Sequence, residues 1–204
     1  MRFSLPLLYL FFLLSPSSLY SQSSKLTASQ SYDILWGEKP IGTFTAKQSI
    51  DDQKESYVFL AEVNFKVLWK KYRRVTRLTS NYIGDSLIFC SNSSRLNEEI
   101  KDSSWVRSSK GQYQIFNYPD EVSEISKPIN FSIPHLYFKD PKEFDDSIFV
   151  EGHTEFMKFE KVDDSNFKLH FPGGNSNIYT YKNERLEKLY VDRSWFNLWF
   201  IRTD

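Results

Sequence analysis

The chain of 204 residues is poor in the residue types that build disulfide, metal and nucleotide sites. It has one cysteine, Cys90, three histidines and seven glycines. One cysteine cannot form an internal disulfide, so the core alone must hold the fold together. The formal net charge is zero, with 26 basic and 26 acidic side chains, which excludes bulk electrostatic attraction to nucleic acid. We therefore expect no nucleic-acid partner.

A long apolar run occurs at the start of the chain, from Leu5 to Leu14, behind the positive charge of Arg2. A membrane-spanning helix needs about 20 apolar residues, so this run is too short to anchor the protein. Small residues follow it from Ser15 to Ser21, as in a cleavable secretory signal peptide. The sequence predicts a signal peptide over residues 1–21 and export to the periplasm or the extracellular space.

The rest of the chain is dominated by a hydrophobic period of two. From Tyr57 to Val67 the odd positions are apolar or small while most even positions are polar, which is typical of a strand with one buried face. Similar segments recur between turn signals such as Pro172-Gly173-Gly174, and tight turns between neighbouring strands force antiparallel pairing. We expect strands over 31–36, 41–50, 55–68, 73–83, 86–91, 104–108, 112–118, 154–162, 166–171, 177–181, 185–191 and 195–201.

The alternation breaks over residues 119–146, where four prolines are spaced through the sequence. This stretch is expected to be a short irregular or helical connecting segment, with at most two helical turns near Pro134 to Phe138. Residues 22–204 are thus predicted to form a single all-β domain. An antiparallel sheet of this kind needs its edges closed or covered, so we expect a meander that forms a curled sheet or an incomplete β-barrel.

The opening Tyr32-Asp33-Ile34, the following Ile41-Gly42 and the closing Asn177-Ile178-Tyr179-Thr180-Tyr181 carry a resemblance to a known family. They resemble an uncharacterised, domain-of-unknown-function family of exported β-rich envelope proteins of Gram-negative bacteria. That family is similar in outline to the incomplete barrels of the lipoprotein carriers LolA and LolB. The resemblance implies a fold and a compartment, and it brings no catalytic or binding residues with it.

Residues with catalytic or metal-binding chemistry do not form a recognisable motif. Glu151, His153 and Glu155 would share one face of a strand at i, i+2, i+4 spacing, but we interpret them as a solvated face. The carboxylate pairs Glu98-Glu99 and Asp145-Asp146 point apart and are expected to be solvated as well. We predict no catalytic residue, no metal site and no cofactor, and we favour a non-enzymatic protein over an enzyme.

The strongest local charge feature is a basic cluster beside Trp69 and Tyr72, which consists of Lys70, Lys71, Arg73, Arg74 and Arg77. Such a cluster is able to contact lipid head groups or an acidic glycan, although a solvated end of the sheet is the favoured interpretation. Charges also recur in the short closing strands, for example at Lys168 and Lys188, which argues against a membrane-spanning barrel.

These observations predict a non-enzymatic, exported envelope protein whose sheet has a concave face able to hold an apolar ligand or lipid, or the surface of a protein partner. A hydrolase with carboxylate chemistry and a structural module of an envelope complex stay open as alternatives. The ligand prediction depends on the interior. The residues expected to face it are Tyr57, Phe59, Val63, Phe65, Phe167, Leu169 and Phe171. Their alternation tells which face is inward, but both a filled core and an open pocket are compatible with it.

Overall fold

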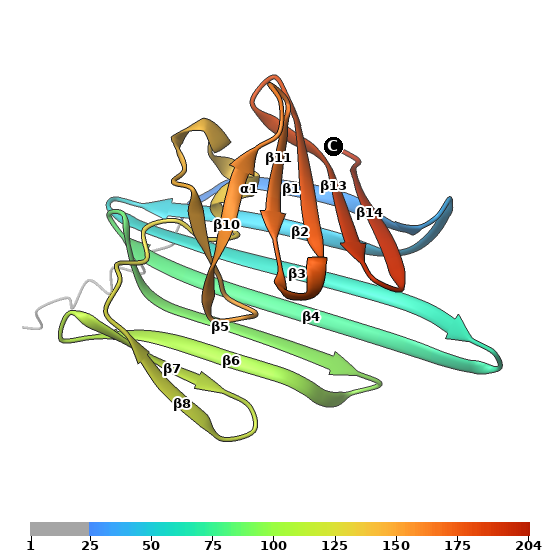
Figure 1. Cartoon of the computed structure of the whole chain (residues 1–204), viewed down its shortest axis with the longest axis horizontal. Coiled ribbons are helices and arrows are strands. Elements are labelled where there is room, and N and C mark those ends of the chain that lie inside the picture. Colours follow the sequence, from blue (N-terminus) through green and yellow to red (C-terminus); the bar gives the residue numbers. More distant parts are fainter. Residues whose placement is uncertain (1–24) are drawn as a thin grey trace, which may run out of the picture.

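The computed structural model describes residues 25–204, which form one antiparallel sheet of fourteen strands (Figure 1). The predicted signal peptide over 1–21 lies outside these described residues. Strands that follow one another along the chain are neighbours from β1 to β8 and from β9 to β14, and β1 also pairs with β14. The edge strands β8 and β9 do not pair with each other, so the sheet is curled and not closed. The predicted all-β meander is confirmed.

The first eight strands form one wing of the sheet: β1 Lys25–Trp36, β2 Lys39–Asp51, β3 Lys54–Val67, β4 Lys70–Ile83, β5 Ser86–Leu96, β6 Glu99–Ser109, β7 Gln112–Asn117 and β8 Glu121–Ile125. The other six form the second wing: β9 Ser147–Val150, β10 Glu155–Lys161, β11 Asn166–His170, β12 Ser176–Lys182, β13 Arg185–Arg193 and β14 Phe196–Arg202. Helix α1, His135–Phe138, and the short 3-10 helix η1, Pro141–Glu143, lie between the wings in sequence, and a second 3-10 helix, η2, covers Pro172–Gly174.

Two of the fourteen strands were not expected from the sequence. Strand β8 occupies the start of the segment 119–146, which the sequence predicts to be irregular or helical throughout, and it pairs with β7. Its residues are exposed or half-buried, so it lacks the apolar alternation that marks a strand. Strand β9 also lacks apolar alternation, but for the opposite reason. Ile148, Phe149 and Val150 are all buried, because both faces of this strand are covered. The helix expected near Pro134 to Phe138 is present as α1.

Strands β2 and β3 approach each other closely at Gly42. A Cβ atom at this position would overlap the backbone carbonyl of Glu62 on β3. Only glycine therefore permits this pairing without a shift of one strand. The β3–β4 turn has a different kind of constraint, since Leu68 adopts a left-handed conformation with a φ of 55°. A two-residue turn with this backbone matches the twist of the flanking strands.

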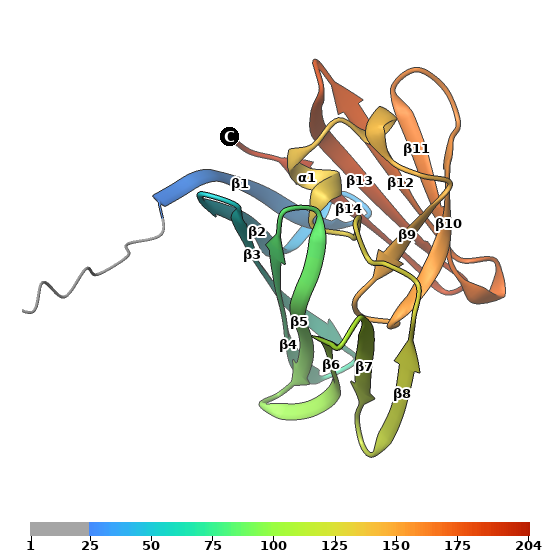
Figure 2. The same cartoon turned by 90° about the vertical axis from the view of Figure 1, so that its left-hand side faces the viewer.

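Helix α1 fills the concave side between the two wings (Figure 2). The Tyr137 ring packs against the rings of Phe59 on β3, Phe44 on β2 and Tyr32 on β1, at centroid distances of 4.8, 5.1 and 5.8 Å. Tyr137 and its neighbour Leu136 are 5% and 0% exposed. The helix is thus a hydrophobic plug, and its burial accounts for the local break in the strand pattern.

Both wings also hold the backbone of the plug through hydrogen bonds. Gln30 on β1 donates from Nε2 to the Tyr137 carbonyl at 2.6 Å, and the hydroxyl of Tyr181 on β12 donates to the Leu136 carbonyl at 2.7 Å. These carbonyls belong to a helix of only four residues, so they have few partners within the helix itself.

Among the described residues, no helix has the length and apolar character needed to cross a membrane.

Burial along β3 changes from one end to the other. Tyr57 and Phe59, under the plug, are 0% and 5% exposed, whereas Val63 and Phe65 on the same face are only half-buried. On the opposite wing Phe167 and Leu169 are buried, and Phe171 is partly buried against the core. The concave face is therefore a filled core at one end and open at the other. The sequence is compatible with a filled core and with an open pocket, and the structure contains both.

This gradient predicts different stabilities for two phenylalanine variants of the same strand. Phe59→Ala should lower the free energy of unfolding by about 3–5 kcal/mol, because the plug leaves little room for the core to collapse. Phe65→Ala should cost clearly less, since half-buried atoms lose less contact area. Equilibrium denaturation of both variants measures the difference, and equal losses would contradict the gradient.

Candidate functional site

Two adjoining pockets at the open end of the concave face are together called the groove. The smaller pocket lies on the concave face, whereas the larger one extends over the strand ends, because residues from both faces of β3 and β4 line it. The larger pocket encloses about 720 Å³ and the smaller about 200 Å³, and they share Trp36, Ile41 and Phe65. The other lining residues of the larger pocket are Gly37, Lys39, Asn64, Lys66, Lys71, Tyr72, Arg73 and Asn97; those of the smaller are Val63, Arg74, Trp195, Phe196 and Leu198. Three hairpins, β1–β2, β3–β4 and β13–β14, supply most of these residues.

Strand register explains the apolar floor of the groove. The alternation of β3 directs Val63 and Phe65 to the concave side, and antiparallel pairing places Arg74 opposite Val63 and Tyr72 opposite Phe65 on β4. The rings of Phe65 and Tyr72 stack at a centroid distance of 5.3 Å with an interplanar angle of 17°. Cross-strand aromatic pairs of this kind stabilise the sheet and present a flat apolar surface.

The predicted basic cluster is divided between the two faces of β4. Arg73 points to the outer face and pairs with Glu62 at 2.8 Å and Glu98 at 2.9 Å. Hydrogen bonding to Arg73 keeps the pKa of Glu62 below its ordinary value. Arg74 points to the groove instead, where its Nε donates to Ser94 Oγ at 2.9 Å. Within residues 25–204, no carboxylate lies within ion-pair distance of Arg74.

A second polar cluster lies under the plug, around Glu151. Ser132 Oγ and Ser80 Oγ donate to Glu151 Oε1 at 2.6 and 3.0 Å, and the Tyr82 hydroxyl lies 2.6 Å from Ser132 Oγ. Ser104 Oγ donates to the backbone carbonyl of Glu151 at 3.0 Å. Burial raises the pKa of Glu151 to about 7, although the hydrogen bonds from the two serines oppose the rise.

The prediction that Glu151, His153 and Glu155 form a solvated strand face is wrong for Glu151, which is 0% exposed. The chain turns between β9 and β10 at this point, and Thr154 adopts a left-handed conformation, so the three residues do not share one strand. His153 instead packs against Phe171 at a ring distance of 5.3 Å. No group of three metal-ligating side chains occurs in the part of the chain that the structure describes.

His135 completes the buried cluster as a neutral imidazole. Its Nδ1 accepts the Ser132 N–H at 3.2 Å, and burial lowers its pKa to about 3. Because His135 is 1% exposed and Ser80, Ser132 and Glu151 are 0% exposed, a substrate cannot reach these groups while the core is closed. The cluster joins the segment between the wings to β4 and β6, which is a structural role.

The remaining candidates are not gathered into a site. Glu98 pairs with Arg73, Glu99 pairs with Lys101 at 2.6 Å, and both carboxylates are mostly exposed, as expected. Asp145 and Asp146 are exposed as well. Cys90 is 1% exposed on β5, and burial raises the pKa of its thiol well above the ordinary value. A thiol in this environment is a poor nucleophile.

Sequence reasoning placed Val63 and Phe65 on the inward face but missed Trp36 and Trp195, because these groove residues lie far apart along the chain. Trp36 and Trp195 lie at or beside hairpin turns, where polar residues are the rule. The signal in the sequence for these residues was a large apolar side chain at a turn position. That signal indicates a shared site only once the curl of the sheet is known, because the curl brings the turns together.

Fold and groove together define an open, curled antiparallel sheet protein with a ligand-sized hollow on its concave face. Residues 32–203 match the family described as "Domain of unknown function (DUF6134)", and the chain belongs to this family. No curated protein and no solved structure matches the chain.

The buried Glu151 carboxyl predicts a pH-dependent stability. Its pKa is about 7 in the folded protein against 4.5 in the unfolded chain, so below about pH 4 both states hold the proton and burial costs nothing electrostatic. As the pH rises from about 4.5 to about 7, the unfolding free energy falls, and above this range it levels off because both states are ionised. Relative to wild type, Glu151→Gln should gain about 3 kcal/mol between about pH 4 and pH 8. Urea denaturation at both pH values measures this gain, and a pH-independent difference would contradict it.

Proposed function

We propose that this protein is a non-enzymatic binder of an anionic amphiphile, exported to the periplasm or the extracellular space. The observation that carries the proposal is the groove itself, in which an apolar floor lies next to Arg74, a cation with no carboxylate within ion-pair distance among residues 25–204. An apolar ligand would bury its chain on the floor, and its acidic head would be held by this cation.

The apolar part of the ligand would lie along the residues that the sheet directs to its concave side. Phe65, Val63 and Ile41 form the floor, with Trp36 and Leu198 beside them. The larger pocket, which contains Ile41, Phe65 and Trp36, has a volume of about 720 Å³, within the range of about 300–1,000 Å³ that is usual for small-molecule sites. The smaller pocket, which contains Val63 and Leu198, adds about 200 Å³ next to it. Burial of a single hydrocarbon chain there would supply most of the binding free energy.

The acidic head group would be recognised by Arg74, with Lys71 and Lys39 at the mouth. An arginine held by a hydrogen bond to Ser94 is oriented in advance, and it keeps free donors for a carboxylate or phosphate oxygen. The alternative of carboxylate-dependent hydrolysis gains no support from Glu151, because the core covers it.

Loss of the aromatic floor should weaken binding of a fatty acid. We expect Phe65→Ser to reduce the affinity for cis-parinaric acid, a fluorescent fatty acid, by at least about tenfold, since a buried Phe contributes about 1.5–3 kcal/mol. Leu60→Ser is the matched control, because Leu60 lies on the outer face of the same strand and is 44% exposed. Fluorescence titration gives both affinities. Equal affinities of the two variants would contradict the assigned floor, and no saturable binding by wild type would contradict the proposed function.

The head-group assignment predicts a change in selectivity. Arg74→Gln should weaken binding of cis-parinaric acid by about tenfold, because a charge-assisted hydrogen bond is lost, while binding of its uncharged methyl ester stays the same. Arg77→Gln is the control, because Arg77 lies on the outer face of β4 beside Leu60. An equal loss for acid and ester would show that Arg74 supports the groove without recognising charge.

A further inference from the structure

Large apolar side chains are exposed at three hairpin turns. The β1–β2 turn carries Trp36, the β3–β4 turn carries Leu68 and Trp69, and the β13–β14 turn carries Trp195. Their exposed fractions are 48%, 76%, 77% and 85%. Turns are normally polar, and an exposed group of large apolar residues marks an interaction surface. These four residues are called the rim.

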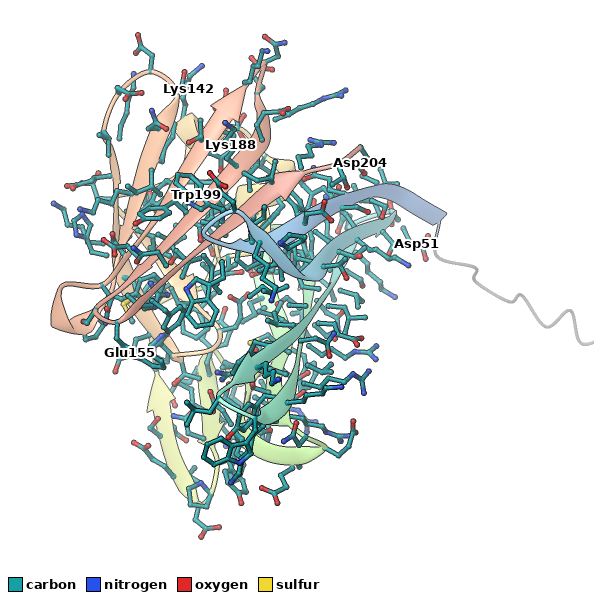
Figure 3. The ribbon with its side chains drawn as sticks, turned by 90° about the vertical axis from the view of Figure 1, so that its right-hand side faces the viewer. Asp51, Lys142, Glu155, Lys188, Trp199 and Asp204 are labelled. Atoms are coloured by element: carbon teal, nitrogen blue, oxygen red, sulfur yellow. The ribbon has the colours of Figure 1, made fainter. Side chains whose placement is uncertain are left out.

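The rim lies next to the groove, and two of its four residues line it. Trp36 and Trp195 both line the smaller pocket, together with Phe65. The β3–β4 turn continues directly from the stacked pair of Phe65 and Tyr72, so Leu68 and Trp69 lie at the tip of the hairpin that bears the floor. All three turns lie at the right-hand end of the molecule in Figure 1, and Figure 3 looks onto this end.

Cationic side chains accompany the rim. Lys66, Lys70 and Lys71 flank the β3–β4 turn, and Lys39 follows the β1–β2 turn. Within the described residues, none of these four lysines has a carboxylate within ion-pair distance. Of the nearby acids, Glu62 and Glu98 are paired with Arg73, and Glu38 is exposed in the β1–β2 turn, so the basic residues outnumber the unpaired acid. The surface around the rim therefore has positive charge to offer to an anionic partner.

We propose that the rim docks onto the surface of a lipid bilayer with anionic head groups, so that the groove exchanges its amphiphile with the membrane. Tryptophan is favoured at the level of the head groups because its ring is apolar and its N–H is a donor. Lysines next to the rim would contact lipid phosphates, as juxtamembrane basic residues do. The exchange part of this inference rests on the proposed function, whereas the docking can be tested by itself.

Sedimentation with vesicles tests the docking. Wild type should bind vesicles of phosphatidylcholine and phosphatidylglycerol and release them at high salt, since charge attraction is screened. The double variant Leu68→Ser/Trp69→Ser should bind at least about tenfold more weakly. Its matched control is Tyr118→Ser/Val122→Ser, which also removes one exposed aromatic and one exposed aliphatic residue, at 52% and 70% exposure, in the β7–β8 hairpin at the edge of the sheet.

The double variant Lys70→Gln/Lys71→Gln measures how much positive charge contributes to vesicle binding, separately from the apolar rim. This variant should lose affinity for the anionic vesicles and keep the weak affinity of wild type for pure phosphatidylcholine. Circular dichroism of each variant verifies that the exposed substitutions leave the sheet folded. Absence of vesicle binding by wild type, or equal losses in the rim variant and its control, would overturn the docking.

Binding of cis-parinaric acid without vesicles distinguishes the two proposals. A rim variant that binds the free fatty acid like wild type and no longer binds vesicles supports docking through the rim. A wild type that binds vesicles through the rim but not the free fatty acid would overturn the groove ligand and leave the docking in place. A wild type that binds the fatty acid but not the vesicles would overturn the docking alone.

Discussion

The contact between helix α1 and the two wings is the constraint on which the rest of the structure depends. A curled sheet has one apolar concave face, and that face is stable in water only where something covers it. Tyr137 covers it by packing against Phe59, Phe44 and Tyr32, and the hydrogen bonds from Gln30 and Tyr181 attach the helix to both wings. Four residues are too few to cover the whole face. The groove is the part of the concave surface that the plug does not reach, so the same element that completes the core also sets the limits of the candidate site.

Burial acts in opposite directions on the pKa values of Glu151, under the plug, and of His135, the first residue of the plug. It raises the pKa of Glu151 and lowers that of His135, because in both cases the charged form loses its hydration. The hydrogen bonds through Ser132 connect these two residues, so the network joins an acid and a base that both favour their neutral forms. Such a network orients the segment between the wings with little charge in the core. It explains why polar residues are found there without an accessible catalytic site.

Local patterns in the sequence predicted most of the strands of the fold but few of the residues of the candidate site. The alternation around Tyr57 and the turn signals identified the meander, because strand period and turn chemistry are properties of adjacent residues. They failed at β8, whose faces are both largely exposed, and at β9, whose faces are both buried. Glu151 was misjudged because its burial depends on Ser80, which is 71 positions away. The rim was missed for the same reason: Trp36 and Trp195 meet at one pocket only through the curl of the sheet.

The seam between β1 and β14 has a consequence for the folding pathway. Every other strand pair in the sheet joins neighbours in sequence, so each wing can form by successive hairpin closure with a small loop entropy. The seam pairs Tyr32 with Arg202, and the Thr203 N–H donates to the carbonyl of Ser31 at 2.9 Å. These contacts cannot form before the residues of β14 and Thr203 are present, although β1 is the first strand of the described chain. Until then, β1 in the first wing has one unpaired edge. The step that joins the two wings is the slow one, because it pairs residues that are far apart in the sequence.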